Sequence, residues 1–308
     1  MVSTRQAYGE ALASLGDKYK DVVVLDADLA EATKTVLFKK KFPDRFFDMG
    51  IAEADMVGTA AGLSTCGKIP FASSFAMFAV GRAFEQVRNS VAYPNLNVKI
   101  AATHSGITVG EDGATHQAIE DISLMRAVPN MRVICPADQY ETAWAVEEAI
   151  KINGPVYIRL GRCDVPDIYS ENTKFEFGKG IELRKGSDVT IIATGIMVSK
   201  AIEASSELEN KGISTRVIDM HTIKPIDKEI IIKAAKETRG IVVAEEHSII
   251  GGLGSAVAEV VSETYPSKVI RVGIEDTFGQ SGKATELLEE YGLTSQKIII
   301  KVQEILKY

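Results

Sequence analysis

The sequence predicts an α/β protein with two domains, each a mostly parallel sheet with helices on both faces. Short apolar runs rich in Val and Ile alternate with helical segments along most of the 308 residues, as they do in parallel α/β folds. That length is more typical of two domains than of one. The polar, turn-forming stretch 166–180 interrupts the alternation, and we interpret it as a linker between a domain at 1–165 and a domain at 181–308.

The first domain is expected to begin with a helix that ends near Leu15. Ser3 and Gln6 have the spacing of a capping box ahead of this helix. Short apolar runs then predict a series of buried strands, which are 22–28, 46–50, 69–75, 97–103, 131–137 and 154–162. The helices predicted among them are 52–63, one near 82–91, and one opened by Asp138 and Glu141 with a second capping-box spacing.

The second domain repeats the alternation of strands and helices. Its predicted strands are 188–195, 214–220, 240–246 and 268–274. The segment GGLGSA at 251–256 contains two glycines of a dinucleotide-binding fingerprint, but Val257 stands where a third glycine is required. We therefore interpret this segment as the glycine-rich start of a helix.

Composition excludes several classes of function. The formal net charge of -7 and the sequence pI of about 5.3 argue against binding to nucleic acid. Cys66, Cys135 and Cys163 lack metal-ligand spacing and are expected to be reduced thiols. The N-terminus lacks the apolar core of a signal peptide, and no apolar stretch has the length of a membrane span. These features predict a soluble, cytoplasmic protein without membrane contacts.

Candidate functional residues follow several of the predicted strands. Ligands of parallel α/β sheets bind beyond the carboxyl ends of the strands, so polar and aromatic residues there are the first candidates. In the first domain these are Asp26, Asp28, Gly50, Glu53, Ser73, Phe75, Phe78, His104, Arg159 and Arg162. In the second domain they are His221, Glu245, Glu246 and His247.

The loop THSGITVGEDGATHQ at 103–117 carries much of the polar chemistry. His104 and His116 flank three glycines and the acidic residues Glu111 and Asp112. Glycines allow a ligand to approach the backbone, and histidines can transfer protons near neutral pH. The two histidines are too far apart in the sequence to share a helix face, which argues against a metal site. The alternative interpretation is a polar surface turn.

Glu53, Phe75 and Phe78 each allow two interpretations. Glu53 follows a predicted strand and opens a helix, where a carboxylate is favoured by the helix dipole. If it is buried, it could instead share a proton with a ring nitrogen of a ligand. Phe75 and Phe78 could pack in the core or form a flat wall for an aromatic ring.

Seven segments, taken together, resemble the transketolase family and cover nearly the whole chain in family order. Those that resemble the pyrimidine-binding domain are FFDMGIAEADMVGTAAGL, IPFASSFAMF, THSGITVGEDGATHQ and MRVICPADQYET. Those that resemble the transketolase C-terminal domain are IDMHTIKPID, VVAEEHSIIGGLGSAVAE and SGKATELLEEYGL. The resemblance implies thiamine diphosphate as cofactor and transfer of a two-carbon ketol unit between phosphorylated sugars, as in the pentose phosphate pathway.

The resemblance also implies roles for individual residues. Glu53 matches the catalytic glutamate that binds N1′ of the aminopyrimidine and promotes the tautomer that deprotonates C2 of the thiazolium ring. Phe75 and Phe78 match the aromatic pocket around the pyrimidine. The residues that match substrate contacts are Asp112 and His116 for the sugar hydroxyls, with His116 also catalytic, and Arg5, His104 and Arg162 for the sugar phosphate.

Two departures from the family pattern carry consequences. Ala32 stands where the family has a phosphate-contacting serine, and Thr33 and Thr35 are the nearest substitutes. The GDG motif and downstream asparagine, which hold Mg²⁺ (or Ca²⁺) and the diphosphate, are missing from this chain. The resemblance therefore implies a C-terminal subunit that is inactive alone and forms a heterotetramer of two large and two small chains with an N-terminal subunit.

Three alternatives remain open from the sequence. The beta subunit of a 2-oxo-acid dehydrogenase has the same two-domain build but lacks the GEDGATHQ loop. A 1-deoxyxylulose-5-phosphate synthase shares GIAE and DGxTHQ, although Glu111 and the segment SGK at 281–283 fit transketolase better. A non-catalytic module that binds thiamine compounds is the third alternative.

Overall fold

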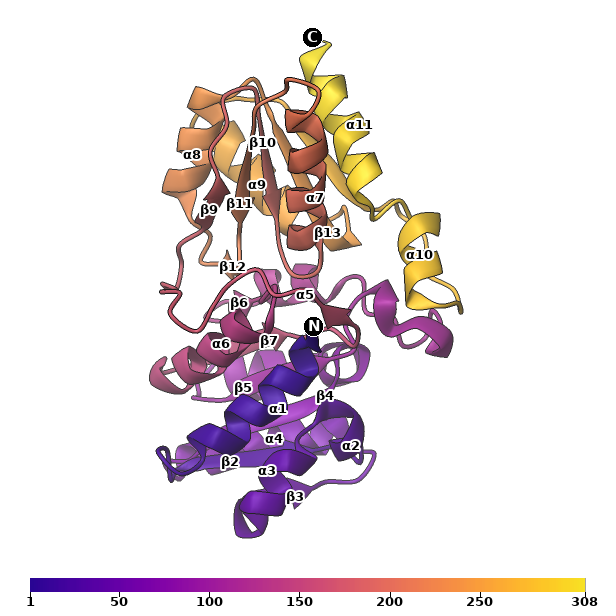
Figure 1. Ribbon diagram of the computed structural model, residues 1–308. Helices are drawn as coiled ribbons and strands as arrows, with labels where there is room; N and C mark the ends of the chain where they lie inside the picture. The colour runs from indigo at the N-terminus through magenta and orange to yellow at the C-terminus, as the bar shows by residue number, and fades with distance from the viewer. Residues whose placement is uncertain (308) are drawn as a thin grey trace.

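Two α/β units, one above the other in Figure 1, organise the chain, and the α/β fold class is confirmed. The computed structural model describes residues 1–307. The larger sheet has seven strands, in the spatial order β12 (Thr222–Lys224), β6 (Arg132–Ile134), β7 (Val156–Arg159), β5 (Lys99–Thr103), β4 (Ile69–Phe75), β2 (Val22–Asp26) and β3 (Phe46–Asp48). The smaller sheet has five, in the order β14 (Val269–Ile274), β13 (Ile241–Ser248), β10 (Val189–Ala193), β11 (Thr215–Asp219) and β9 (Ile181–Arg184).

Each sheet is parallel except for one antiparallel edge strand. β12 pairs antiparallel with β6, and β9 pairs antiparallel with β11. All residues of β2, β5 and β10 are buried, because helices cover both faces of the central strands. Every strand predicted from an apolar run is present. The strands that the sequence did not predict are the short ones, β9, β12 and the pair β1 (Val2–Ser3) and β8 (Asp164–Val165).

Helices pack on both faces of the two sheets (Figure 1). Those of the first unit are α1 (Thr4–Leu15), α2 (Ala30–Thr33), α3 (Val36–Lys41), α4 (Glu53–Thr65), α5 (Asp121–Ala127) and α6 (Gln139–Lys151), with 3₁₀ turns η1 (Pro43–Arg45) and η4 (Ile107–Asp112). Those of the second unit are α7 (Met197–Glu209), α8 (Lys228–Glu237), α9 (Leu253–Glu263), α10 (Ala284–Glu290) and α11 (Ser295–Leu306). The helix predicted near 82–91 is instead two π-helical segments, η2 (Met77–Arg82) and η3 (Gln86–Ala92).

The two predicted capping boxes have different outcomes. Ser3 occupies the N-cap of α1 but its side chain makes no capping hydrogen bond, and Gln6 bonds to Glu10 instead, so the first box is wrong. At α6, Asp138 Oδ1 accepts a hydrogen bond from the Glu141 backbone N–H at 2.9 Å, as expected of an N-cap. The Glu141 carboxylate, however, accepts from the backbone N–H of Ala137 rather than from that of Asp138.

Hydrogen bonds and a shared strand join the two units in addition to the covalent chain. Residues 166–180 contain no helix or strand and run along the first unit, where Asp138 accepts hydrogen bonds from their backbone N–H groups at 2.8–2.9 Å. β12 belongs to the second half of the sequence yet extends the sheet of the first. We retain 1–165 and 181–308 as the proposed domains, with β12 as a strand that the second contributes to the first.

Glu141 and Asp219 form a buried pair of carboxyl groups between the two units. Both are at most 1% exposed, and the Tyr169 hydroxyl donates to Asp219 at 2.7 Å. One oxygen of each, Glu141 Oε1 and Asp219 Oδ1, has no other partner among the described residues. Burial raises the pKa of both carboxyl groups, that of Asp219 to about 7, and the charge of Asp219 adds to the rise at Glu141. The pair therefore retains a shared proton under acidic conditions.

This proton predicts a stability that falls with rising pH. Because the folded pKa is raised, the contribution is complete below the ordinary aspartate pKa of 3.8 and is lost by about pH 7. For each proton that the pair retains, the free energy of unfolding should decrease by at most about 1.4 kcal/mol per pH unit in that window. Urea denaturation between pH 4 and 8 should show this slope in the wild type and a flatter one in Asp219→Asn. Equal slopes would contradict the shared proton.

Candidate active site

A stack of aromatic rings lies at the carboxyl ends of β4 and β5. Phe75 ends β4, and Phe78 follows in η2, with their ring centroids 6.0 Å apart and the planes 16° from parallel. His104 follows β5 with a positive φ of 56°, and its ring lies 3.8 Å from that of Phe75. His116 meets the Phe78 ring edge-on at 5.1 Å. Four of the predicted site residues thus form one contiguous cluster of rings.

Glu53 is buried next to this stack. It is the first residue of α4, is 1% exposed, and reaches the helix after the turn at Gly50, which has a positive φ of 68°. Arg82 Nη1 donates a hydrogen bond to Glu53 Oε2 at 2.8 Å, and the guanidinium carbon lies 4.5 Å from the centroid of Phe78. The sequence did not predict Arg82. The feature of the sequence that could have indicated Arg82 as a site residue is its position, four residues after Phe78 in the same segment.

Arg5 and His104, which lie 99 residues apart in the sequence, contact each other. Arg5 Nη1 lies 3.3 Å from His104 Nε2. Because a guanidinium can only donate, Nε2 must be the acceptor, and Nδ1 then carries the proton and faces Thr103 Oγ1 at 2.9 Å. Burial, with the charges of Arg5 and Arg162, lowers the pKa of His104 to about 3. His104 is therefore neutral at physiological pH and adds no positive charge.

Arg162 lies near these residues but is already paired. Its Nη1 atom donates to the Val109 carbonyl and lies 3.2 Å from the Glu111 carboxylate and 3.8 Å from that of Asp112. Its charge also contributes, after burial, to a lowered pKa of Arg5. The structure thus brings Arg162 and Asp112 together, but two acidic side chains offset the charge of Arg162.

The threonines near Ala32 are not free to replace a serine. Thr33 and Thr35 are fully buried, and both hydroxyls donate to Asp26 Oδ2, at 2.7 and 2.8 Å. The Ala32 carbonyl accepts a hydrogen bond from Arg5 at 3.0 Å. This loop therefore orients Arg5 but offers no threonine hydroxyl to an anion.

Candidate residues of the second unit have structural partners. Glu245 accepts hydrogen bonds from the backbone N–H groups of Leu253 and Gly254 at the start of α9, at 2.7 and 2.8 Å. A carboxylate already occupies the helix end that a dinucleotide phosphate would require, so the interpretation of GGLGSA as a glycine-rich helix start is confirmed. Glu246 accepts from the Thr108 N–H at 2.8 Å across the two units. His221 is buried, and burial lowers its pKa to about 4.

The segment 280–283 of the second unit covers the GEDG loop. Gln117 donates a hydrogen bond to the Gln280 carbonyl at 3.0 Å. Gly113 has a positive φ of 76°, and a Cβ there would lie 2.5 Å from Ser281 Oγ. In Figure 1, α10 accordingly extends from the second unit to the side of the first. The second unit therefore shapes the rim of the site.

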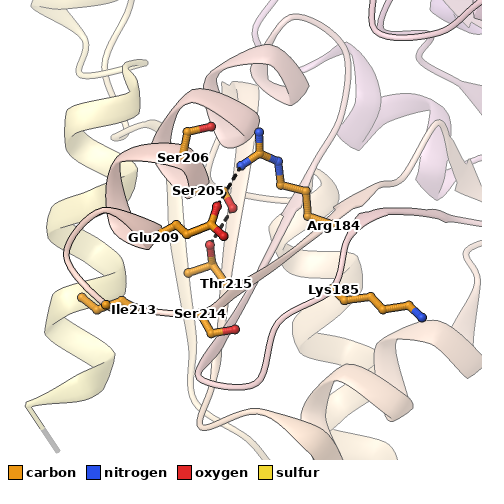
Figure 2. A pocket seen from close by; sticks show the side chains of 9 residues that line it. Arg184, Lys185, Ser205, Ser206, Glu209, Ile213, Ser214 and Thr215 are labelled. Carbon is orange, nitrogen blue, oxygen red and sulfur yellow. Dashed lines mark hydrogen bonds and ion pairs between the residues drawn. The ribbon is translucent and has the colours of Figure 1, made fainter.

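A second cavity lies away from the aromatic stack. A cavity of about 530 Å³ lies on the second unit between Arg184, the end of α7 and the start of β11 (Figure 2). Four of its polar side chains form two pairs, Thr215 with Ser205 at 2.8 Å and Arg184 with Glu209 at 4.0 Å. Residues 1–307 contain no group of three His, Cys, Asp or Glu placed to hold a metal ion, and none of their helices is long and apolar enough to span a membrane.

Comparison with known proteins gives matches along nearly the whole chain. The family model of the transketolase pyrimidine binding domain matches residues 1–167, and that of the transketolase C-terminal domain matches residues 178–298. A Methanocaldococcus jannaschii protein, provisionally named as a transketolase C-terminal section, is 55% identical over 98% of this chain and 96% of its own. A 6-deoxy-6-sulfo-D-fructose transketolase subunit of a Clostridium species is 44% identical over 98% of this chain and 94% of its own.

A solved structure shows the same organisation. The protein, described as a split-gene transketolase in an inactive beta4 tetramer, is 57% identical and superposes with a TM-score of 0.94 over 100% of this chain and 99% of its own. The chain also spans about half the length of the longer transketolases that it matches. The chain belongs to the transketolase family and is similar, over nearly its whole length, to proteins described as the C-terminal section or the beta chain of split transketolases.

Proposed function

We propose that this chain, assembled with an N-terminal subunit, transfers a two-carbon ketol unit from a ketose phosphate to an aldose phosphate with thiamine diphosphate as cofactor. The observation that supports this most strongly is the buried carboxylate of Glu53 beside the stacked rings of Phe75 and Phe78. A heteroaromatic ring packs well on such rings, and a buried carboxylate can hold a proton at a ring nitrogen. These residues fit an aminopyrimidine.

In this proposal each protein group has a defined task. When bound, thiamine diphosphate supplies the carbon nucleophile for ketol transfer. Glu53 holds the proton at N1′, and Phe75 and Phe78 fix the plane of the pyrimidine. His116, at the edge of Phe78, moves a proton at a sugar oxygen, and Asp112 accepts hydrogen bonds from sugar hydroxyls.

Arg5 is the main phosphate ligand in this proposal. Its Nε atom is buried and has no hydrogen-bond partner within residues 1–307, which leaves a donor for an anion. His104 orients Arg5 through Nε2 rather than binding phosphate as a cation. Arg162 contributes less, because Glu111 and Asp112 offset its charge. Relatives named for a sulfo-sugar and for apulose 4-phosphate make the anionic end of the substrate the part to test.

The partner supplies the rest of the site. We propose an N-terminal subunit that carries the GDG motif and the asparagine, holds Mg²⁺ (or Ca²⁺) and the diphosphate, and forms a heterotetramer of two large and two small chains with this one. The 57% identical split-gene transketolase is described as inactive when it forms a tetramer of beta chains alone. That description supports a requirement for the second polypeptide here as well.

The test is reconstitution from purified subunits. Ketol transfer should require this chain, its N-terminal partner, thiamine diphosphate and a divalent cation, and EDTA should abolish it. Xylulose 5-phosphate, 6-deoxy-6-sulfo-D-fructose and pyruvate should be compared as donors. Activity of the rigorously purified chain alone would overturn the split-site proposal. A preference for pyruvate would instead indicate one of the dehydrogenase or synthase alternatives.

A further inference from the structure

Arg82 makes two contacts that a bound aminopyrimidine would also need. It ends η2, the π-helical segment that follows β4, so Phe75, Phe78 and Arg82 belong to one continuous stretch of chain. Its guanidinium lies over the Phe78 ring at 4.5 Å and donates to Glu53 Oε2 at 2.8 Å. A planar, nitrogen-bearing group thus stacks on the aromatic wall and bonds to the buried acid.

The exposure of the two partners is unequal. Glu53 is 1% exposed, whereas the side chain of Arg82 is 50% exposed. Within the described residues, Arg82 is the only ion-pair partner of Glu53. The guanidinium therefore gives a carboxylate that is costly to bury alone both a counter-charge and a hydrogen-bond donor. Being half exposed, Arg82 can move into solvent and keep its own charge hydrated, which Glu53 cannot do.

We propose that Arg82 is an internal substitute for the aminopyrimidine, bound to Glu53 in the cofactor-free chain and displaced when thiamine diphosphate binds. The inference rests on the proposed function, since it assumes that the cofactor uses Glu53. Arg82 must leave Glu53 before the cofactor can bind. The apparent association constant is therefore the intrinsic one multiplied by the fraction of chains in which Arg82 is displaced. A charge-assisted hydrogen bond, discounted for the exposure of Arg82, corresponds to roughly a three- to thirtyfold reduction.

The test measures thiamine diphosphate binding to the complex of this chain with its N-terminal subunit and Mg²⁺, by isothermal titration calorimetry. Arg82→Met retains an apolar stem over Phe78 but removes the charge and the donor, so the dissociation constant should fall roughly three- to thirtyfold. Arg82→Lys keeps a charge without the planar guanidinium, so its dissociation constant should lie between those of the wild type and Arg82→Met.

A double-mutant cycle supplies the control. In a Glu53→Gln background, Arg82→Met should change the dissociation constant less than about twofold, because the ion pair no longer exists. Circular dichroism and gel filtration of each complex show whether it is folded and assembled, and Arg82→Lys serves as the test variant if Arg82→Met is not.

Three outcomes would count against the proposal in different ways. If the wild-type complex binds thiamine diphosphate and Arg82→Met binds it equally well, the arginine does not compete, and the inference fails alone. Weaker binding by Arg82→Met would show that the arginine stays on Glu53 as a permanent counter-ion, which also overturns it. A wild-type complex that binds no thiamine diphosphate would overturn the proposed function and this inference together.

Discussion

Glu53→Ala should lower kcat of the assembled enzyme by about 10²–10⁴-fold, the usual cost of losing a positioned acid–base group. Glu53→Gln, which keeps the size and a hydrogen-bond donor but cannot exchange a proton, should lose a similar factor. Melting temperatures should change little, because the partner left behind is the half-exposed Arg82, which water can solvate. The expected cost at the helix start is about 0.3–1 kcal/mol.

Proton exchange at C2 of bound thiamine diphosphate measures the proposed role directly. Deuterium incorporation can be followed by NMR after acid quench, and it should slow with kcat in both Glu53 variants. Asp55→Ala is a matched control, since Asp55 is an exposed carboxylate in the same first turn of α4. It should leave exchange and turnover unchanged. Wild-type exchange rates in Glu53→Ala would show that this carboxylate does not activate the cofactor.

Arg159→Ala should destabilise the chain by about 3–5 kcal/mol, the usual result of removing one member of a buried ion pair. Arg159 Nε and Asp121 Oδ2 are 2.7 Å apart, and the two residues are 4% and 0% exposed. Burial alone would raise the pKa of Asp121, but the charge of Arg159 holds it below the usual value. Without Arg159, a buried carboxylate would remain uncompensated.

The same substitution should loosen the contact between the two units. Arg159 also donates to the Glu246 carbonyl at 2.9 Å, so one guanidinium joins β7, α5 and β13. Urea denaturation should show an earlier midpoint, whereas Arg132→Ala, on the neighbouring strand and outside this network, should change stability by about 0.5 kcal/mol or less. The double variant Arg159→Met, Asp121→Leu should recover much of the loss. An Arg159→Ala midpoint equal to that of the wild type would contradict the argument.

The parts of the fold that the sequence predicts are those determined by local pattern. The residues of β2 and β5 are buried on both faces, so their apolar runs are unbroken and easily recognised. β12 has three residues and becomes a strand only by pairing with β6, which no local pattern encodes. The π-helical form of η2 and the missing side-chain cap at Ser3 likewise depend on packing rather than on spacing.

The candidate site divides in the same way. The family motifs predict Glu53, Phe75, Phe78, His104 and His116 as site residues, and the structure places them at the carboxyl ends of β3, β4 and β5 or beside the resulting ring stack. The sequence did not predict which of these side chains pair with one another through hydrogen bonds or ion pairs. The use of Thr33 and Thr35 by Asp26, and the pairing of Arg162 with Glu111, follow only from three-dimensional contacts. Arg82 is the most consequential of these, because its partner lies 29 residues away.

The strand β12 also has a consequence for biosynthesis. A ribosome makes the first sheet's other strands by residue 159, yet the edge of that sheet at β6 stays bare until residues 222–224 emerge. A bare edge is a template for pairing with other chains. The nascent first unit must therefore wait for more than sixty further residues, about three to thirteen seconds at common elongation rates. A protein fragment that ends within the stretch 166–180 would lack β12, and the edge of its sheet at β6 would stay permanently unpaired.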